Sequence, residues 1–173
     1  MAAPTFAGFQ RKLVVGIAEF AAANSPDMIL TTYSLGSCIG VAVYDPVYAV
    51  GGLVHVMLPE SKLSPEKAAA RPGMFMDTGV PALLRAVCQM RADKSRLLVY
   101  VVGGAQIMDT SGYFNIGKRN YEALQGLLRQ FGLRIYAEEV GGLVNRTVNL
   151  HIATGEVWLK ISGQPKEVQL CRR

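Results

Sequence analysis

Short apolar segments of the kind that form β-strands recur along most of the chain and are separated by turn residues. They are rich in Val, Ile, Leu and Thr, and several neighbours are joined by connections too short for a parallel crossover. Hairpins must therefore build much of the sheet structure. The predicted strands cover residues 12–17, 28–33, 41–44, 50–58, 97–102, 133–140, 148–152 and 157–161.

Two longer segments carry apolar residues at three- and four-residue intervals, which is typical of helices with one buried face. The first begins at Asp77 or Thr78, either of which is a suitable N-cap, and the second covers residues 118–130 and ends at Gly132. Residues 61–73 are polar, contain two prolines and are predicted to form a surface loop. The sequence thus predicts an α+β fold with mixed β-sheets and about two main helices. The apolar positions are Val80, Leu83, Leu84, Val87 and Met90 in the first helix and Tyr121, Leu124, Leu127, Leu128 and Phe131 in the second.

Length and composition favour a single compact domain. The chain has 173 residues, half of them hydrophobic, which suffices for one sizeable core. We expect this core to cover about residues 12–162, with short flexible ends. No stretch approaches the roughly 18 consecutive apolar residues of a membrane-spanning helix, and the N-terminus lacks the pattern of a secretory signal. These features predict a soluble, cytoplasmic protein without membrane insertion.

The cysteines and histidines show no metal-binding or disulfide pattern. Cys38, Cys88 and Cys171 are widely spaced and form no CxxC pair, which favours a reducing compartment. His55 and His151 are also far apart, so we expect no metal and no cofactor. His151 is interpreted as a structural residue.

The net charge of +5 and the isoelectric point near 9.2 favour an acidic partner. Nucleic acid, an anionic membrane surface and an acidic protein all satisfy this condition. The basic residues are scattered rather than gathered in one stripe, so solubility explains the charge equally well. A nucleic-acid-binding module rests on the isoelectric point alone, and we expect no nucleic-acid partner.

Cys38 is the candidate nucleophile. It lies between Gly36-Ser37 and Gly40, where the missing side chains let a substrate carbonyl and backbone N–H groups approach the sulfur. The alternative is a small buried residue in a tight bend, which is the commoner role of an arbitrary cysteine.

Hairpin geometry connects Cys38 with His55. If the loop consists of residues 45–48, Tyr44 faces Ala49 and Cys38 lies directly opposite His55. Cross-strand partners have Cβ atoms about 4.5 to 5.5 Å apart, which suits a thiol–imidazole contact. A shift of one residue would place the two side chains on opposite faces. His55 alone would more often be a structural histidine.

A thiol beside an imidazole is suited to nucleophilic catalysis, because the imidazole can accept the thiol proton and later protonate a leaving group. Thr32, six residues before Cys38, is the candidate that orients the imidazole by accepting its hydrogen bond. It is equally compatible with an ordinary strand residue. Asp45 and Glu60 are the nearest carboxylates and are less suitable. The pairs Gly103-Gly104 and Gly141-Gly142 form no phosphate-binding motif and are interpreted as turns.

Two segments resemble the CheD family. Residues 32–38, TYSLGSC, match a T-x-x-x-G-S-C motif, and residues 54–59, VHVMLP, match a following A-H-x-M-L-P-like motif with Val54 in place of the usual alanine. The resemblance covers about residues 12–162. Further collinear matches are Gly16–Glu19, Asp45-Pro46, Gly103–Ala105, Asn115–Asn120, Gly141-Gly142 and Asn145-Arg146.

This resemblance implies a function and a site. Cys38, His55 and Thr32 would be catalytic, and the six-residue spacing to the cysteine selects Thr32 rather than Thr31. The family has a layered α/β/β fold similar to the catalytic domains of deamidating bacterial toxins. It converts glutamines of chemoreceptor cytoplasmic helices to glutamate, can hydrolyse glutamyl methyl esters, and is regulated by the phosphatase CheC.

The reaction implied is attack of the Cys38 thiolate on a glutamine carboxamide, with a thioester intermediate that water hydrolyses. Backbone N–H groups near Gly36 and Ser37 would hold the oxyanion. A cysteine protease or a transglutaminase could use the same dyad. A non-catalytic adaptor that binds receptors or CheC is the alternative from another class.

Overall fold

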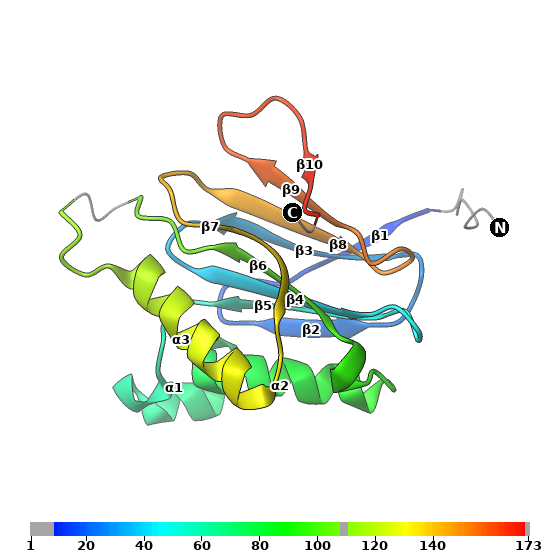
Figure 1. Ribbon diagram of the computed structural model, residues 1–173, viewed down its shortest axis with the longest axis horizontal. Helices are drawn as coiled ribbons and strands as arrows, with labels where there is room; N and C mark the ends of the chain where they lie inside the picture. Colours follow the sequence, from blue (N-terminus) through cyan, green and yellow to red (C-terminus); the bar gives the residue numbers. More distant parts are fainter. Residues whose placement is uncertain (1–8, 108–110, 172–173) are drawn as a thin grey trace.

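Two five-stranded β-sheets lie face to face, and helices cover the outer face of one of them (Figure 1). The computed structural model describes residues 9–107 and 111–171. The first sheet has the order β1-β3-β8-β9-β10 and the second, which the helices cover, has β2-β5-β4-β6-β7. The strands are β1 (Arg11–Val14), β2 (Phe20–Ala23), β3 (Met28–Leu35), β4 (Ile39–Asp45), β5 (Val50–Val56), β6 (Leu98–Gly103), β7 (Ile135–Val140), β8 (Arg146–His151), β9 (Val157–Ile161) and β10 (Val168–Gln169).

Both sheets are mixed. β1 pairs with β3, and β6 with β7, in parallel, whereas the remaining pairs are antiparallel. The chain passes through β2 of the other sheet between β1 and β3, and through α3 between β6 and β7, whereas tight turns join β4 to β5 and β8 to β9. The predicted α+β fold with mixed sheets in a layered α/β/β arrangement is confirmed.

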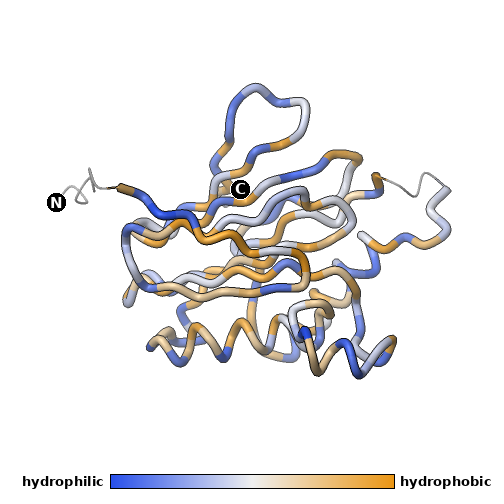
Figure 2. The backbone as a smooth tube through the Cα atoms, turned by 180° about the vertical axis from the view of Figure 1, so that it is seen from behind, coloured by the Kyte–Doolittle hydropathy of each residue, from blue (hydrophilic) through white to orange (hydrophobic). Residues whose placement is uncertain are grey.

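The central strands separate two apolar cores. Along β4, Val41 and Val43 pack toward the helices, while Ala42 and Tyr44 pack toward the first sheet. Hydrophobic segments accordingly gather in the stacked strands, whereas the loop between β9 and β10 projects from them and is largely hydrophilic (Figure 2). All residues of β4 and β5 are buried. This double coverage makes the β4–β5 hairpin the centre of the fold.

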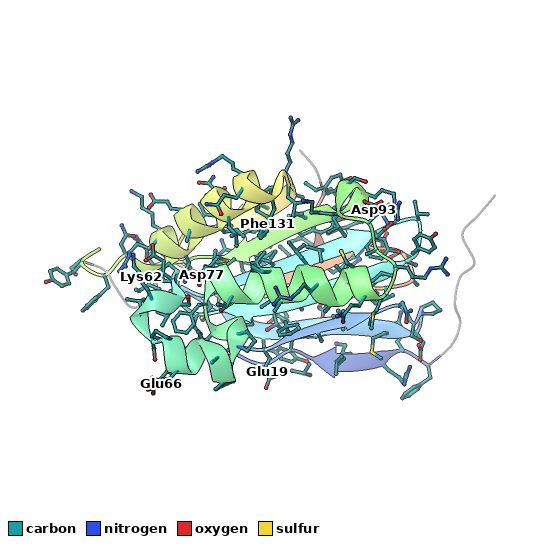
Figure 3. The ribbon with its side chains drawn as sticks, turned by 90° about the horizontal axis from the view of Figure 1, so that it is seen from below. Glu19, Lys62, Glu66, Asp77, Asp93 and Phe131 are labelled. Carbon is teal, nitrogen blue, oxygen red and sulfur yellow. The ribbon has the colours of Figure 1, made fainter. Side chains whose placement is uncertain are left out.

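The helix layer contains α1 (Pro65–Ala70), α2 (Met76–Gln89) and α3 (Ile116–Phe131). α2 and α3 are the two predicted helices, and Gly132 ends α3 in the left-handed conformation, as predicted. The predicted cap of α2 is wrong, because Phe75 is the N-cap and Asp77 instead accepts hydrogen bonds from Ser61. Figure 3 shows Asp77 at this end of the helix layer. No helix among the described residues is long and apolar enough to cross a membrane.

Residues 61–73 do not form the predicted loop. They contain the 3-10 helices η1 (Ser61–Leu63) and η2 (Pro72–Met74) on either side of α1. Pro65 and Pro72 each occupy the first turn of a helix, where proline loses no hydrogen bond. The prolines that suggested a loop therefore mark helix starts.

Three strand assignments differ most from the prediction. β1 ends at Val14 instead of extending to residue 17, and β2 and β10 were not predicted. β2 contains three consecutive alanines, a residue depleted in strands, and its antiparallel pairing with β5 forms it. β10 has only two residues, too few to show alternation.

The hairpin register differs from the prediction by two residues. The loop has the predicted four residues but consists of 46–49, so Asp45 faces Val50 and Tyr44 faces Gly51. His55 is therefore opposite Gly40, and the predicted direct pairing of Cys38 with His55 is wrong. A shift of two residues keeps every side chain on its face.

The turn of this hairpin is held by a buried carboxylate. Asp45 accepts hydrogen bonds from the backbone N–H of Val47 at 2.9 Å and of Asp93 at 2.8 Å. The Nη2 atom of Arg96 donates a third at 2.7 Å. Burial would raise the pKa of Asp45, but these hydrogen bonds and the positive charge of Arg96 outweigh it and lower the pKa to about 2.

Candidate active site

Thr32 and His55 meet between the two sheets. Thr32 belongs to β3 in the first sheet and His55 to β5 in the second, and both are buried. The Thr32 Oγ1 atom lies 2.7 Å from His55 Nδ1. Thr31 points to the other face, where its hydroxyl donates to Asn149. The sequence spacing that selected Thr32 over Thr31 thus identified the threonine that contacts the histidine.

A second contact of Thr32 defines the tautomer of His55. Thr32 Oγ1 donates its hydrogen to the carbonyl oxygen of Val15 at 2.7 Å, because a carbonyl can only accept. The same oxygen must then accept from His55, so Nδ1 carries the ring hydrogen. His55 Nε2 is left with a lone pair, and it is buried without a hydrogen-bond partner among the described residues. The Nε2 atom of His55 is therefore available to accept a proton.

The backbone of His55 is fixed by the connection between β1 and β2. His55 N–H donates to the carbonyl of Glu19 at 3.0 Å, and Ala18 N–H donates to the carbonyl of His55 at 2.9 Å. Ala18 adopts φ 63°, a left-handed conformation that forms this tight turn. Together with Val15, this short segment orients both the histidine backbone and the threonine side chain.

Cys38 lies in the bend between β3 and β4, immediately before β4. It is half-buried and packs against the apolar core between the sheets. Cys38 and Gly40 are alternate residues, so they share a face, and Gly40 pairs with His55. The sulfur and the imidazole therefore belong to the same inter-sheet space as diagonal neighbours, which in a regular ladder are about 7 to 8 Å apart.

A pocket of about 450 Å³ opens beside Cys38. One side of the pocket is formed by the bend that contains Cys38. Most of the other lining residues belong to the segment after β6 and the start of α3. Cys38 is among the residues that line this pocket. The lining residues are Ser34, Gly36, Ser37, Cys38, Ala105, Gln106, Ile107, Phe114, Ile116, Gly117 and Asn145.

Burial favours the uncharged forms of both reactive groups. It raises the pKa of the Cys38 thiol, which a hydrogen bond from the residue's own backbone N–H partly offsets. Burial also lowers the pKa of His55 to about 4. Near neutral pH the site therefore holds a thiol and a neutral imidazole rather than a thiolate–imidazolium pair.

The bend around Cys38 is held by backbone contacts that the sequence did not predict. Gly104 N–H donates to the carbonyl of Cys38, and Ala105 N–H donates to the carbonyl of Gly36, each at 2.8 Å. A side chain at Gly103 would lie 2.2 Å from the Cys38 carbonyl, and this residue has φ +112°. The Gly103-Gly104 pair is thus more than a turn, because glycine is required for this close approach. Gly141 N–H in turn donates to the carbonyl of Gly103.

Asp45, the second histidine and the other two cysteines lie outside this site. Asp45 is at the opposite end of the hairpin, and His151 is on β8, paired with Ile29. Cys88 and Cys171 are exposed free thiols. Within residues 9–107 and 111–171, no group of three His, Cys, Asp or Glu side chains could hold a metal ion.

Sequence comparison identifies the family. The profile described as "CheD chemotactic sensory transduction" matches residues 57–161. A "Probable chemoreceptor glutamine deamidase CheD" of Solibacter usitatus is 44% identical over 157 residues, covering 91% of this chain and 93% of the relative. This chain belongs to the CheD family. The "Chemoreceptor glutamine deamidase CheD" of Thermotoga maritima is 38% identical and covers 92% of this chain and 98% of its own.

The match to the CheD profile begins two residues after His55 and contains the Gly103-Gly104 pair and α3. The profile match therefore does not include Thr32, Cys38 or His55. Among solved structures, the Bacillus licheniformis hypothetical protein YfiH aligns with 13% identity and a TM-score of 0.39. The alignment covers 72% of this chain and about half, 49%, of that one.

Proposed function

We propose that this CheD-family chain is a protein-glutamine deamidase with Cys38 as nucleophile, His55 as acid and base, and Thr32 as the residue that orients His55. The observation that carries this proposal is the relay from the Val15 carbonyl through Thr32 to His55 Nδ1. It leaves Nε2 unprotonated in the inter-sheet space that it shares with Cys38. That arrangement provides the base that a buried, protonated thiol requires.

The reaction begins with proton transfer from the Cys38 thiol to His55 Nε2 as the thiolate attacks the carboxamide carbon of a glutamine. The C–S bond forms, and the carbonyl electrons move to oxygen, giving a tetrahedral oxyanion. Backbone N–H groups of the bend at Gly36, Ser37 and Cys38 stabilise that oxygen. When the intermediate collapses, the C–N bond breaks and His55 returns its proton to the departing nitrogen, which leaves as ammonia.

The thioester is then hydrolysed. His55, again neutral, accepts a proton from a water molecule that attacks the acyl carbon. The C–S bond then breaks, His55 returns this proton to the Cys38 sulfur, and the released carboxylic acid loses its proton to solvent as glutamate. A glutamyl methyl ester would form the same thioester with methanol as the leaving group. An esterase activity therefore needs no additional residue.

The printed names of the relatives support chemoreceptors as the substrate class. The substrate glutamines would lie on chemoreceptor cytoplasmic helices, and the reaction would then take place in the cytoplasm. A CheC-like phosphatase is proposed as regulator on the family resemblance alone.

The test is to incubate the purified chain and its Cys38→Ala variant with a glutamine-bearing chemoreceptor cytoplasmic fragment, following fragment mass and released ammonia. The wild type should release ammonia and add about one dalton per modified site, and Cys38→Ala should do neither. A shortened fragment would indicate a protease. Receptor binding that Cys38→Ala retains, without ammonia from either form, would indicate an adaptor.

A further inference from the structure

Asn120 is a fully buried polar side chain that joins the two halves of the candidate active site. Its Nδ2 atom donates to the carbonyl oxygen of Ser37 at 3.1 Å and to that of Met57 at 2.9 Å. Ser37 immediately precedes Cys38, and Met57 follows His55 by two residues. Both amide hydrogens are thus used to hold the nucleophile bend against the end of β5.

The start of α3 brings Asn120 within reach of these carbonyls. A side chain at Gly117 would lie 2.3 Å from the carbonyl oxygen of Gly104, so only glycine lets the helix approach the end of β6 this closely. Asn120 follows three residues later and lies on the same face of the helix. The glycine and the asparagine therefore act together to bring the helix against the Cys38 bend.

The contact with Ser37 fixes the direction of one peptide group. In a trans peptide the C=O and the following N–H point in opposite directions, and the described residues contain no cis peptide bond. Because Asn120 holds the Ser37 carbonyl, the N–H of Cys38 points away from the Asn120 side chain. The backbone N–H of a nucleophilic residue lies beside its own attacking atom and is a common oxyanion donor. Held in this direction, the Cys38 N–H is available to the oxyanion that forms when the sulfur attacks.

We propose that Asn120 is a positioning residue that orients the Ser37–Cys38 peptide so that the Cys38 N–H stabilises the oxyanion. This inference rests on the proposed deamidase function. The other side-chain atom supports this role. Asn120 Oδ1 is buried without a hydrogen-bond partner among the described residues, which is destabilising. An apolar side chain would avoid this cost but would leave both carbonyls without a donor, so the two donated hydrogen bonds explain why an asparagine is present.

The test compares two reactions of Cys38 in Asn120→Asp, an isosteric variant. Its carboxylate cannot donate, and its protonated form can donate to only one of the two carbonyls. Deamidation passes through an oxyanion, whereas alkylation of the thiol by iodoacetamide does not. We expect kcat for ammonia release to fall by about 30- to 300-fold with KM changed less than about threefold, because an oxyanion donor is misdirected. The alkylation rate should change by less than about threefold.

Leu128→Ala is the matched control, since Leu128 is buried on the same helix but belongs to the core on the helix side, whereas Cys38 packs against the core between the sheets. It should lower the melting temperature while both reactions keep their wild-type rates in the folded protein. If Asn120→Asp does not fold, Asn120→Ser replaces it, because one hydroxyl can donate to only one of the two carbonyls.

Three results would be decisive against the inference. Unchanged kcat would show that the peptide needs no support from Asn120, and equal losses of deamidation and alkylation would show a general loosening of the bend. A wild type that is alkylated normally but releases no ammonia would refute the proposed function, and this inference with it.

Discussion

The β4–β5 hairpin buries polar groups at both of its ends, and the two ends differ in how these groups are satisfied. At the turn, the fully buried Asp45 carboxylate accepts hydrogen bonds from Val47, Asp93 and Arg96. At the open end, His55 is equally buried, but its Nε2 atom has no partner among the described residues. One end stabilises a charge, and the other keeps a reactive nitrogen free.

The protonation states follow the same division. Hydrogen bonds lower the pKa of Asp45 to about 2 despite its burial, so this carboxylate stays charged. At the open end, burial lowers the pKa of His55 to about 4 and raises that of Cys38, so both groups stay neutral. The comparison teaches that burial alone does not determine charge. The number of donors directed at the buried group does.

The largest expected effect is loss of activity at the open end. His55→Ala and Cys38→Ala should each lower deamidation by about 10³-fold or more, because the thiol and the base act in one proton transfer. The double variant should lose little more than either single variant, since residues that act as a unit are not additive. Ammonia release measures all three. His151→Ala is the control and should keep its activity, and additive losses would contradict the shared role.

At the turn, the expected effect is on stability. Asp45→Asn should lower the free energy of unfolding by about 2 to 4 kcal/mol, because Arg96 and two backbone donors lose a charged acceptor. Urea denaturation measures this change. Deamidation by the folded variant should stay near that of the wild type. Asp27→Asn, which removes the partner of the exposed Arg11, should lower stability less. Equal losses of unfolding free energy in Asp45→Asn and Asp27→Asn would contradict the claim that the buried ion pair contributes more than the exposed one.

The two ends should titrate in separate pH windows. The folded pKa of His55, about 4, is below its ordinary value of 6.5, so the unfolded chain binds this proton more readily. Stability from His55 is therefore present above pH 6.5 and is lost as pH falls toward 4. Asp45 has a folded pKa of about 2 against an ordinary 3.8, so its contribution is lost as pH falls from 3.8 toward 2.

Replacing His55 by glutamine should abolish the loss of stability between pH 6.5 and 4, the upper window, and leave the loss between pH 3.8 and 2, the lower window. Wild-type stability should fall by up to about 3 kcal/mol across the upper window, in line with a shift of two to three pKa units. Urea denaturation at a series of pH values measures both windows. A His55→Gln variant with the same losses as the wild type between pH 6.5 and 4 would contradict the assignment.

The smallest of these effects concerns Thr32. Thr32→Val removes the oxygen that accepts from His55 Nδ1, so we expect kcat to fall by about 10- to 100-fold as the imidazole loses its fixed tautomer. Thr32→Ser keeps the hydroxyl and should recover most of the activity. Steady-state kinetics distinguish the two variants. Equal activity of both would show that only the packing of the side chain matters.

Much of the fold could be predicted, because its main elements have local signals. The apolar intervals of α2 and α3 and the strand-favouring segments of β3 to β9 are readable from neighbouring residues. β2 could not be predicted, since Phe20–Ala23 is held as a strand by its pairing with β5 rather than by its own composition. The loop predicted for residues 61–73 was wrong because the local signal is ambiguous. Proline is compatible both with loops and with the first turn of a helix.

The part of the candidate site that consists of side-chain contacts was partly predictable, whereas the part that consists of backbone contacts was not. The hydrogen bond between Thr32 and His55 was predicted and is present, whereas the direct pairing of Cys38 with His55 failed because the turn lies one residue later. The carbonyl of Val15 and the N–H of Gly104 could not be found, since backbone atoms leave no signal in residue identities. Asn120 stood in a motif of the family resemblance, but its contacts with Ser37 and Met57 depend on the tertiary structure.

The most direct test of the account is the protonation state of His55, measured by ¹⁵N-detected NMR of the imidazole as a function of pH. The account predicts a neutral ring at pH 7, with the hydrogen on Nδ1 and a pKa of about 4. A hydrogen on Nε2, or an imidazolium at pH 7, would show that Thr32 does not hold His55 as a free base for Cys38.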